Sequence, residues 1–234
     1  MKIALVFSGQ ARSFKESYKY YQENLLKAYE VDTFFHTWRH PRIIEQELTD
    51  LYQPKAFMFQ DPEPDSSLKM PALLNGDQRL HKNVYMQSLS IYRSFLVLEK
   101  HVRRNNINYD FAIRTRFDFA LNVQIRFDIL DPSRIYLPNC RSNAEGTLMN
   151  DQFAVSSLTN MLDYSRTFLR LPFIVGTSIN PNAGESLLEA NLKFMGMVGD
   201  KIVYVNMNNP FPPGRYNSTW HSLIRDDYAL WATN

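Results

Sequence analysis

The chain contains one cysteine, Cys140, among its 234 residues. A single cysteine cannot form an intrachain disulfide, and it is too few for a cysteine-rich zinc site. The longest apolar run near the N-terminus is Ile3–Phe7, which is too short for a transmembrane helix or a signal-peptide core. We therefore expect a cytoplasmic protein without a transmembrane segment.

An excess of charge of one sign is also lacking. Lys and Arg total 26, Asp and Glu total 24, and the net charge is +2. The chain therefore lacks the excess of positive charge that nucleic-acid binding requires, so no nucleic-acid partner is expected. Aromatic residues are abundant instead, with 16 Phe, 13 Tyr and 3 Trp. Several stand beside polar, turn-forming residues, where a planar ligand can stack.

The first 35 residues have the pattern of a β-α-β unit. Residues 2–7 form a continuous apolar run with a charged start, which is typical of a strand buried in a parallel sheet. Ser13–Glu16 has the spacing of a capping box, and apolar residues then recur every three or four positions up to Tyr29. Residues 31–35 follow as a second strand, and the crossover between the strands is expected to be right-handed.

The remaining pattern predicts one α/β domain with a mixed, mainly parallel central sheet flanked by helices. Further helices are expected over residues 43–51, 82–104, 158–169 and 183–195. Further strands are expected over residues 56–59, 111–115, 121–125, 134–137, 152–155 and 201–205. Residues 61–80 are polar and proline-bearing, which favours a mobile loop that orders over a ligand, and residues 206–217 are expected to be loop.

The first candidate site is the turn after the first strand, where ligands bind in open α/β sheets. It contains Ser8, Gly9, Gln10 and Arg12. Gly9 lets backbone amides approach a ligand, and Arg12 can pair with a phosphate. The turn is neither a G-x-G-x-x-G sequence nor a P-loop, and an ordinary turn with a surface arginine is the alternative.

The second candidate site follows the next strand, on the same edge. His36 and Trp38 offer a flat face and hydrogen-bond donors that suit a nucleobase or a sugar. The alternative is that Trp38 packs the junction between strand and helix.

The third candidate is the segment from Tyr109 to Phe119, an apolar strand whose end is abruptly charged. Arg114 and Arg116 lie two residues apart, so they share one face of a regular strand and can hold phosphates or orient Asp118. Asp118 can ligate a divalent cation through oxygen. The alternative is a structural network of arginine and aspartate.

Two weaker candidates lie further along the chain. Asp151, before a strand, can act as a general base or bind sugar hydroxyls, or it can cap a turn. His221 can add a nitrogen ligand to a metal held by Asp118, although a lone histidine is more often structural. Glu185 and Glu189, one helical turn apart, are typical of a solvated face.

These motifs, in this order, resemble those of small nucleotide-sugar glycosyltransferases of the GT-A type. Such enzymes occur in bacterial surface-polysaccharide clusters and in large DNA viruses of algae, which glycosylate their own capsid proteins. The residues that carry the resemblance are Leu5–Arg12, Asp32–Trp38, Ile113–Asp118 and Asn150–Phe153. The resemblance covers roughly residues 1–200.

The resemblance implies a single Rossmann-like GT-A domain, with a nucleotide-sugar-binding half over residues 1–120 and an acceptor-side half over 121–234. It also implies a nucleotide diphosphate sugar as donor and a divalent metal, Mn²⁺ or Mg²⁺. Asp118 matches the metal-binding acidic motif, although the family's Asp-x-Asp has only its last carboxylate here. Arg12 matches the edge that binds the donor nucleotide, and Asp151 matches the acidic position near the acceptor.

The leading hypothesis is therefore a glycosyltransferase for hexosyl or deoxyhexosyl transfer. The acceptor is expected to be a hydroxyl of a glycan, a glycoprotein or a lipid-linked molecule, in the cytoplasm or, for a viral protein, in the host cytoplasm. The alternative is a nucleotide-sugar- or carbohydrate-binding protein on the same fold without turnover. A sulfotransferase is disfavoured because the chain has no P-loop-like phosphate cradle.

Overall fold

The computed structural model describes residues 1–64, 78–122, 124–140, 148–149, 151–178, 180, 183–205 and 221–223. The α-helices are α1 (Phe14–Tyr21), α2 (Glu45–Tyr52), α3 (Gln78–Asn105), α4 (Leu158–Ser165), α5 (Thr167–Ile174) and α6 (Gly184–Phe194). The strands are β1 (Lys2–Gly9), β2 (Glu30–Trp38), β3 (Ala56–Gln60), β4 (Phe111–Thr115), β5 (Phe119–Leu121), β6 (Ile135–Cys140), β7 (Leu148–Met149), β8 (Ala154–Ser156), β9 (Ile202–Val205) and β10 (His221–Leu223).

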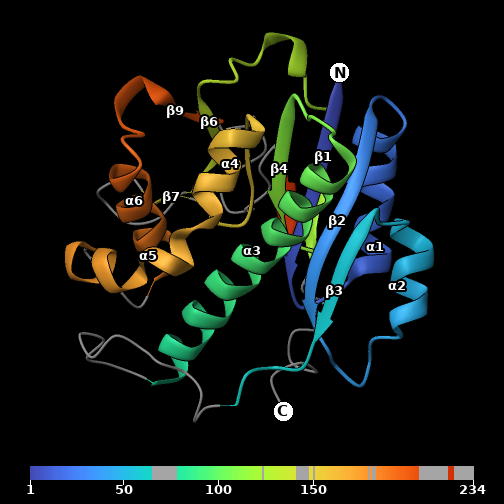
Figure 1. Cartoon of the computed structure of the whole chain (residues 1–234), viewed down its shortest axis with the longest axis horizontal. Helices are drawn as coiled ribbons and strands as arrows, with labels where there is room; N and C mark the ends of the chain where they lie inside the picture. The colour runs from blue at the N-terminus through green and yellow to red at the C-terminus, as the bar shows by residue number, and fades with distance from the viewer. Residues whose placement is uncertain are drawn as a thin grey trace, which may run out of the picture.

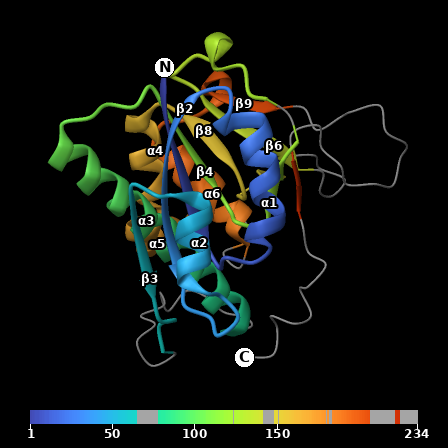
Figure 2. The same cartoon turned by 90° about the vertical axis from the view of Figure 1, so that its right-hand side faces the viewer.

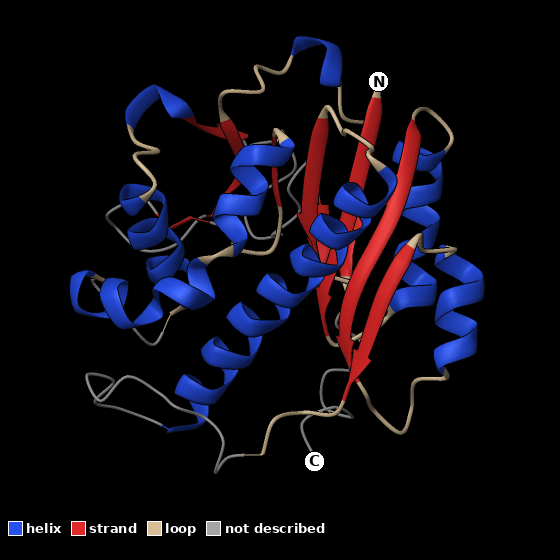
Figure 3. Cartoon of the chain, in the orientation of Figure 1, coloured by secondary structure: helices blue, strands red, loops and turns tan. Residues whose placement is uncertain are grey.

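Most strands belong to one mixed sheet in the order β3-β2-β1-β4-β8-β6-β7, with β9 beside β6 (Figures 1 and 3). The strands β1 to β4 are mutually parallel, whereas β8 runs antiparallel to both β4 and β6. The carboxyl ends of the four parallel strands therefore share one edge of the sheet. Polar side chains gather at this edge.

Helices cover both faces of the sheet (Figure 2). The alternation of β1 explains this arrangement, because Ile3, Leu5 and Phe7 join the core beneath α1 and α2, whereas Ala4 and Val6 join the core beneath α3, α4 and α6. Both faces of β1 are thus apolar and buried, as its continuous apolar sequence predicts.

Side chains of α1 and of the short helical turn after it hold the chain that follows β4. The Tyr21 hydroxyl lies 2.7 Å from Thr115 Oγ1, Ser17 Oγ donates to the Phe117 carbonyl, and Asn24 Nδ2 donates to the Leu121 carbonyl at 2.7 Å. The Phe117 ring is buried and stacks on Phe7 with ring centroids 4.8 Å apart. The turn at residues 116–118 is therefore fixed to α1 and to the core.

The predicted class is confirmed as α/β with a mixed, mainly parallel sheet flanked by helices. The long helix α3 and the strands β1, β3 and β4 lie where the periodicity predicts them. Of the predicted loops, residues 65–77 and 206–217 lie outside the described residues, and the end of the first, from Gln78, is helical. No helix among the described residues is long and apolar enough to span a membrane.

Three local predictions were wrong. Ser13 has a left-handed backbone with φ of 49° and its side chain caps nothing, so the capping box is absent. The helix predicted over 158–169 is interrupted at Arg166, between α4 and α5. There the Thr167 hydroxyl donates to the Tyr164 carbonyl at 2.8 Å and competes with backbone N–H groups for that acceptor. The strand predicted over 121–125 is instead β5, which pairs with β10, a partner too distant in sequence for a local pattern to reveal.

The stacking of Phe117 predicts a large stability effect. Phe117→Ala should reduce the free energy of unfolding by about 3–5 kcal/mol, because it removes a fully buried ring and leaves a cavity. Phe173→Ala is the matched control, since Phe173 is 70% exposed and its loss should change stability by less than about 0.5 kcal/mol. Urea unfolding of both variants measures this, and equal effects would contradict the assigned core.

Candidate functional site

The parallel register brings the polar residues at the strand ends side by side. Ser8 of β1 lies beside His36 of β2, Phe7 lies beside Thr115 of β4, and Trp38 of β2 lies beside Gln60 of β3. The first two candidates were predicted to share one edge, and they do; the third candidate, at the end of β4, lies on the same edge. Gly9 ends β1 with φ of 101°, a conformation that favours glycine.

Arg114 is a buried cation at the centre of this edge, with 1% of the residue exposed. Its Nε donates to Ser8 Oγ at 3.3 Å, and its Nη1 donates to the backbone carbonyl of Asp151. Burial lowers the pKa of Arg114, while the nearby Tyr164 and Asp151 oppose that shift. Arg114 thus joins Ser8 to Asp151, and the phosphate contact predicted for it stays a prediction.

Arg12, Arg116 and Asp118 form an ion cluster beside Arg114. Arg12 Nη2 donates to Asp118 Oδ2 at 2.9 Å, and Arg116 donates through Nε and Nη2 to both Asp118 oxygens at 2.8 and 2.7 Å. The Asp118 side chain is 2% exposed, against 15% for Arg12 and 18% for Arg116. The arginine and aspartate network left open by the sequence is thus present, and its arginine side chains are more exposed than its aspartate.

These contacts do not fit a divalent metal at Asp118. Both of its oxygens already accept hydrogen bonds from arginine, and a metal would have to replace these bonds. Within the described part of the chain, no three His, Cys, Asp or Glu side chains are placed to share a metal ion. His221 lies in β10 opposite Leu121, but its side chain is outside the described set, so its role as a ligand stays a prediction.

Asp151 lies against the first residues of α6. Its Oδ2 accepts a hydrogen bond from Gln87 Nε2 of α3 at 2.6 Å, and a Cβ added to Gly184 would lie 2.4 Å from the same oxygen. Glu185, the next residue, is half-buried. Burial and the charge of Asp151 raise the pKa of Glu185, and Arg116 opposes this rise. The site therefore has two neighbouring carboxyl groups next to the arginine cluster.

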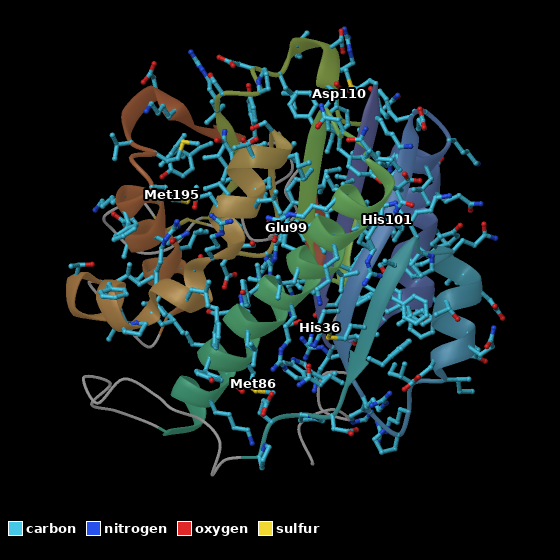
Figure 4. All side chains as sticks on the ribbon, in the orientation of Figure 1. His36, Met86, Glu99, His101, Asp110 and Met195 are labelled. Carbon is cyan, nitrogen blue, oxygen red and sulfur yellow. The ribbon has the colours of Figure 1, made fainter. Side chains whose placement is uncertain are left out.

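His36, labelled in Figure 4, is fully buried at the side of β2 that faces α3. It belongs to a chain of hydrogen bonds. Its Nδ1 lies 2.8 Å from Ser90 Oγ, and its Nε2 lies 3.3 Å from Gln60 Oε1. Ser90 Oγ also accepts the Gly9 N–H at 2.7 Å. Burial lowers the pKa of His36 to about 4, so the ring is neutral at pH 7. A neutral ring that donates from Nε2 to Gln60 Oε1 and accepts from Ser90 at Nδ1 gives both ring nitrogens a partner.

Trp38 is buried as well and packs edge-on against His36, with ring centroids 4.6 Å apart. The guanidinium of Arg93 lies 5.8 Å from the Trp38 ring centroid and donates to Glu63 at 2.9 Å. The packing role that the sequence left open for Trp38 is therefore present. A ligand contact by His36 or Trp38 stays a prediction.

Sequence reasoning missed four residues of this site: Gln87, Ser90, Gly184 and Glu185. Gln87 and Ser90 lie on α3, which the sequence presents mainly as a helix with apolar stripes. The signal that could have identified them is that they are polar residues on a buried helix face. The solvated face predicted for Glu185 and Glu189 was wrong for Glu185, which is half-buried and close enough to Asp151 for that charge to raise its pKa. Glu189 pairs with Lys193 at 2.7 Å, as a residue on a helix surface does.

No protein-family model matches this chain, and no curated protein matches it either.

The contact between Gly184 and Asp151 predicts a reversal of the usual helix preference. Alanine is normally about 1 kcal/mol better than glycine within a helix. Gly184→Ala should nevertheless lower the free energy of unfolding by ~1–3 kcal/mol, because its Cβ would overlap Asp151 Oδ2, and moving that carboxylate would break its hydrogen bond from Gln87. In an Asp151→Ala background the same change should be neutral or stabilising. Chemical denaturation of the four variants measures the coupling, and additive effects would contradict the contact.

The buried neutral His36 predicts acid destabilisation. Its pKa is about 4 in the folded state and about 6.5 in the unfolded chain, so only the unfolded state takes up a proton between these values. The stability that the neutral ring permits is complete above pH ~6.5 and falls by up to about 3 kcal/mol as the pH approaches 4. Unfolding of wild type and His36→Gln from pH 8 to 4 measures this. Parallel profiles would refute the shift.

Proposed function

We propose that this chain is a glycosyltransferase. It transfers a hexosyl or deoxyhexosyl group from a nucleotide diphosphate sugar to a hydroxyl of a glycan, a glycoprotein or a lipid-linked acceptor. The observation that carries the proposal is the pairing of an arginine cluster with two carboxyl groups at the carboxyl edge of the parallel strands. Ligands of open α/β sheets bind at this edge.

The arginine side of the site suits the donor. Breaking the bond between the sugar and the diphosphate leaves negative charge on the departing nucleoside diphosphate. Fixed cations stabilise such charge as it develops, and arginine binds phosphate oxygens in a planar, two-pronged manner. Arg12 and Arg116 are the side chains of the cluster that reach the surface, so they are the proposed contacts to the diphosphate.

The carboxyl side of the site suits the acceptor. In an inverting transfer, a base takes the proton of the attacking hydroxyl while that oxygen forms the new bond to the sugar. Asp151 is the proposed base, held by Gln87 and by Arg114. Glu185 adjoins it, and its raised pKa makes it a second proton acceptor closer to neutral pH.

Release of nucleoside diphosphate from a panel of nucleotide sugars tests the proposal, because slow donor hydrolysis requires no known acceptor. Asp151→Asn and Glu185→Gln should each lower turnover by ~10²–10⁴, the usual effect of losing a general base. Both should bind the nucleoside diphosphate within about twofold of wild type, since neither residue contacts it in the proposal.

Glu189→Gln is the matched control, because Glu189 lies one turn further along α6 and pairs with Lys193 instead. Its turnover should equal that of wild type. If no nucleotide sugar is cleaved although nucleoside diphosphates bind, the chain is a binding protein. If no nucleoside diphosphate binds, the donor site is refuted.

A further inference from the structure

We infer that the ion cluster of Arg12, Asp118 and Arg116 is a metal-independent diphosphate site, in which Asp118 is the anchor of the two arginines. The inference rests on the proposed function for the identity of the donor. It differs from the sequence-based expectation in the role of Asp118, which here orients cations and does not bind one.

The layering of the cluster is the first argument. Asp118 is buried with 2% of its side chain exposed, whereas the side chains of Arg12 and Arg116, which bond to it, are 15% and 18% exposed. An anion that approaches from solvent therefore reaches the arginines before the carboxylate.

The positions of the three residues are the second argument. Arg12 comes from the turn after β1, whereas Arg116 and Asp118 come from the turn after β4. The Tyr21 hydroxyl bonds both Thr115 Oγ1 at 2.7 Å and the Arg116 carbonyl at 3.5 Å, so α1 fixes the second turn relative to the first. The two guanidinium groups are thus held together before a ligand arrives, and this reduces the entropy lost on binding.

The charge balance is the third argument. Two guanidinium groups bond one carboxylate in the cluster, the buried Arg114 acts on Asp118 from close by, and Asp151 and Glu185 offset part of this positive charge. A diphosphate is attracted to such a site. A divalent cation at Asp118 would instead lie beside three guanidinium groups, which repel it.

The chain supplies a matched control for this cluster. Arg126-Phe127-Asp128 repeats the tripeptide Arg116-Phe117-Asp118, and Arg126 also bonds both oxygens of its aspartate, at 2.8 and 2.6 Å. This second pair lies on the surface, with 65% of Arg126 and 55% of Asp128 exposed. It has the local chemistry of the cluster but lies apart from Arg12.

The test is calorimetric titration with inorganic pyrophosphate and with uridine, guanosine, cytidine and thymidine diphosphates, each in EDTA and in Mn²⁺. Wild type should bind pyrophosphate and at least one nucleotide in EDTA, with affinity within about threefold of that in Mn²⁺. Arg12→Gln and Arg116→Gln should each lose at least ~10-fold in affinity, as expected for a lost hydrogen bond to a charged group. Asp118→Asn should lose affinity equally in both media, and Arg126→Gln and Asp128→Asn should match wild type.

Binding that requires Mn²⁺, with Asp118→Asn in Mn²⁺ resembling wild type in EDTA, would make Asp118 a metal ligand and overturn the inference, while the proposed function would survive. Binding of pyrophosphate without any nucleotide would support the cluster and refute the nucleotide-sugar donor. Failure of every ligand in both media would refute both. If Asp118→Asn does not fold, Arg12→Gln and Arg116→Gln still test whether the cluster binds diphosphate without a metal.

Discussion

The guanidinium of Arg114 is the charge around which this site is built. A cation buried in the middle of a sheet is costly unless its hydrogen bonds and its charge are compensated. Arg114 meets this requirement with Ser8 from the end of β1 and with the carbonyl of Asp151 from the segment before β8. Segments more than a hundred residues apart in sequence are thereby fixed to one side chain. Asp151 takes its place in the site through its backbone, which leaves its carboxylate to Gln87 and Gly184.

Acidic and basic side chains both lie close to Arg114. Asp118 lies beneath Arg12 and Arg116, and Glu185 is close enough to Arg116 for that cation to oppose the rise in its pKa. Buried ion pairs add little net stability, because desolvation offsets most of their attraction. Such a concentration of charge at a strand edge is therefore better explained by binding and chemistry than by stability. The apolar clusters on both faces of the sheet supply the stability instead.

Much of this fold could be predicted from the sequence, because the apolar periodicity of β1, β4 and α3 is a local property. The pairing of β5 with β10 and the antiparallel direction of β8 are not local, and no short pattern reveals them.

At the site, the two copies of Arg-Phe-Asp also show that a short sequence does not determine its surroundings. Both form the same two-pronged ion pair, yet only the first is buried beside Arg12. The difference arises from α1, which holds the first copy through its backbone.

The hydrogen bonds of His36 extend the same rigidity to the other end of the site. Ser90 of α3 bonds both His36 and the Gly9 amide, so one hydroxyl joins the helix to the turn after β1. Because burial favours the neutral ring, one nitrogen of His36 donates while the other accepts. Donation from Nε2 to Gln60 Oε1 leaves Nδ1 to accept from Ser90 Oγ, the same oxygen that accepts the Gly9 N–H. A single hydroxyl of α3 therefore contacts both β2 and the end of β1, next to the turn that carries Arg12.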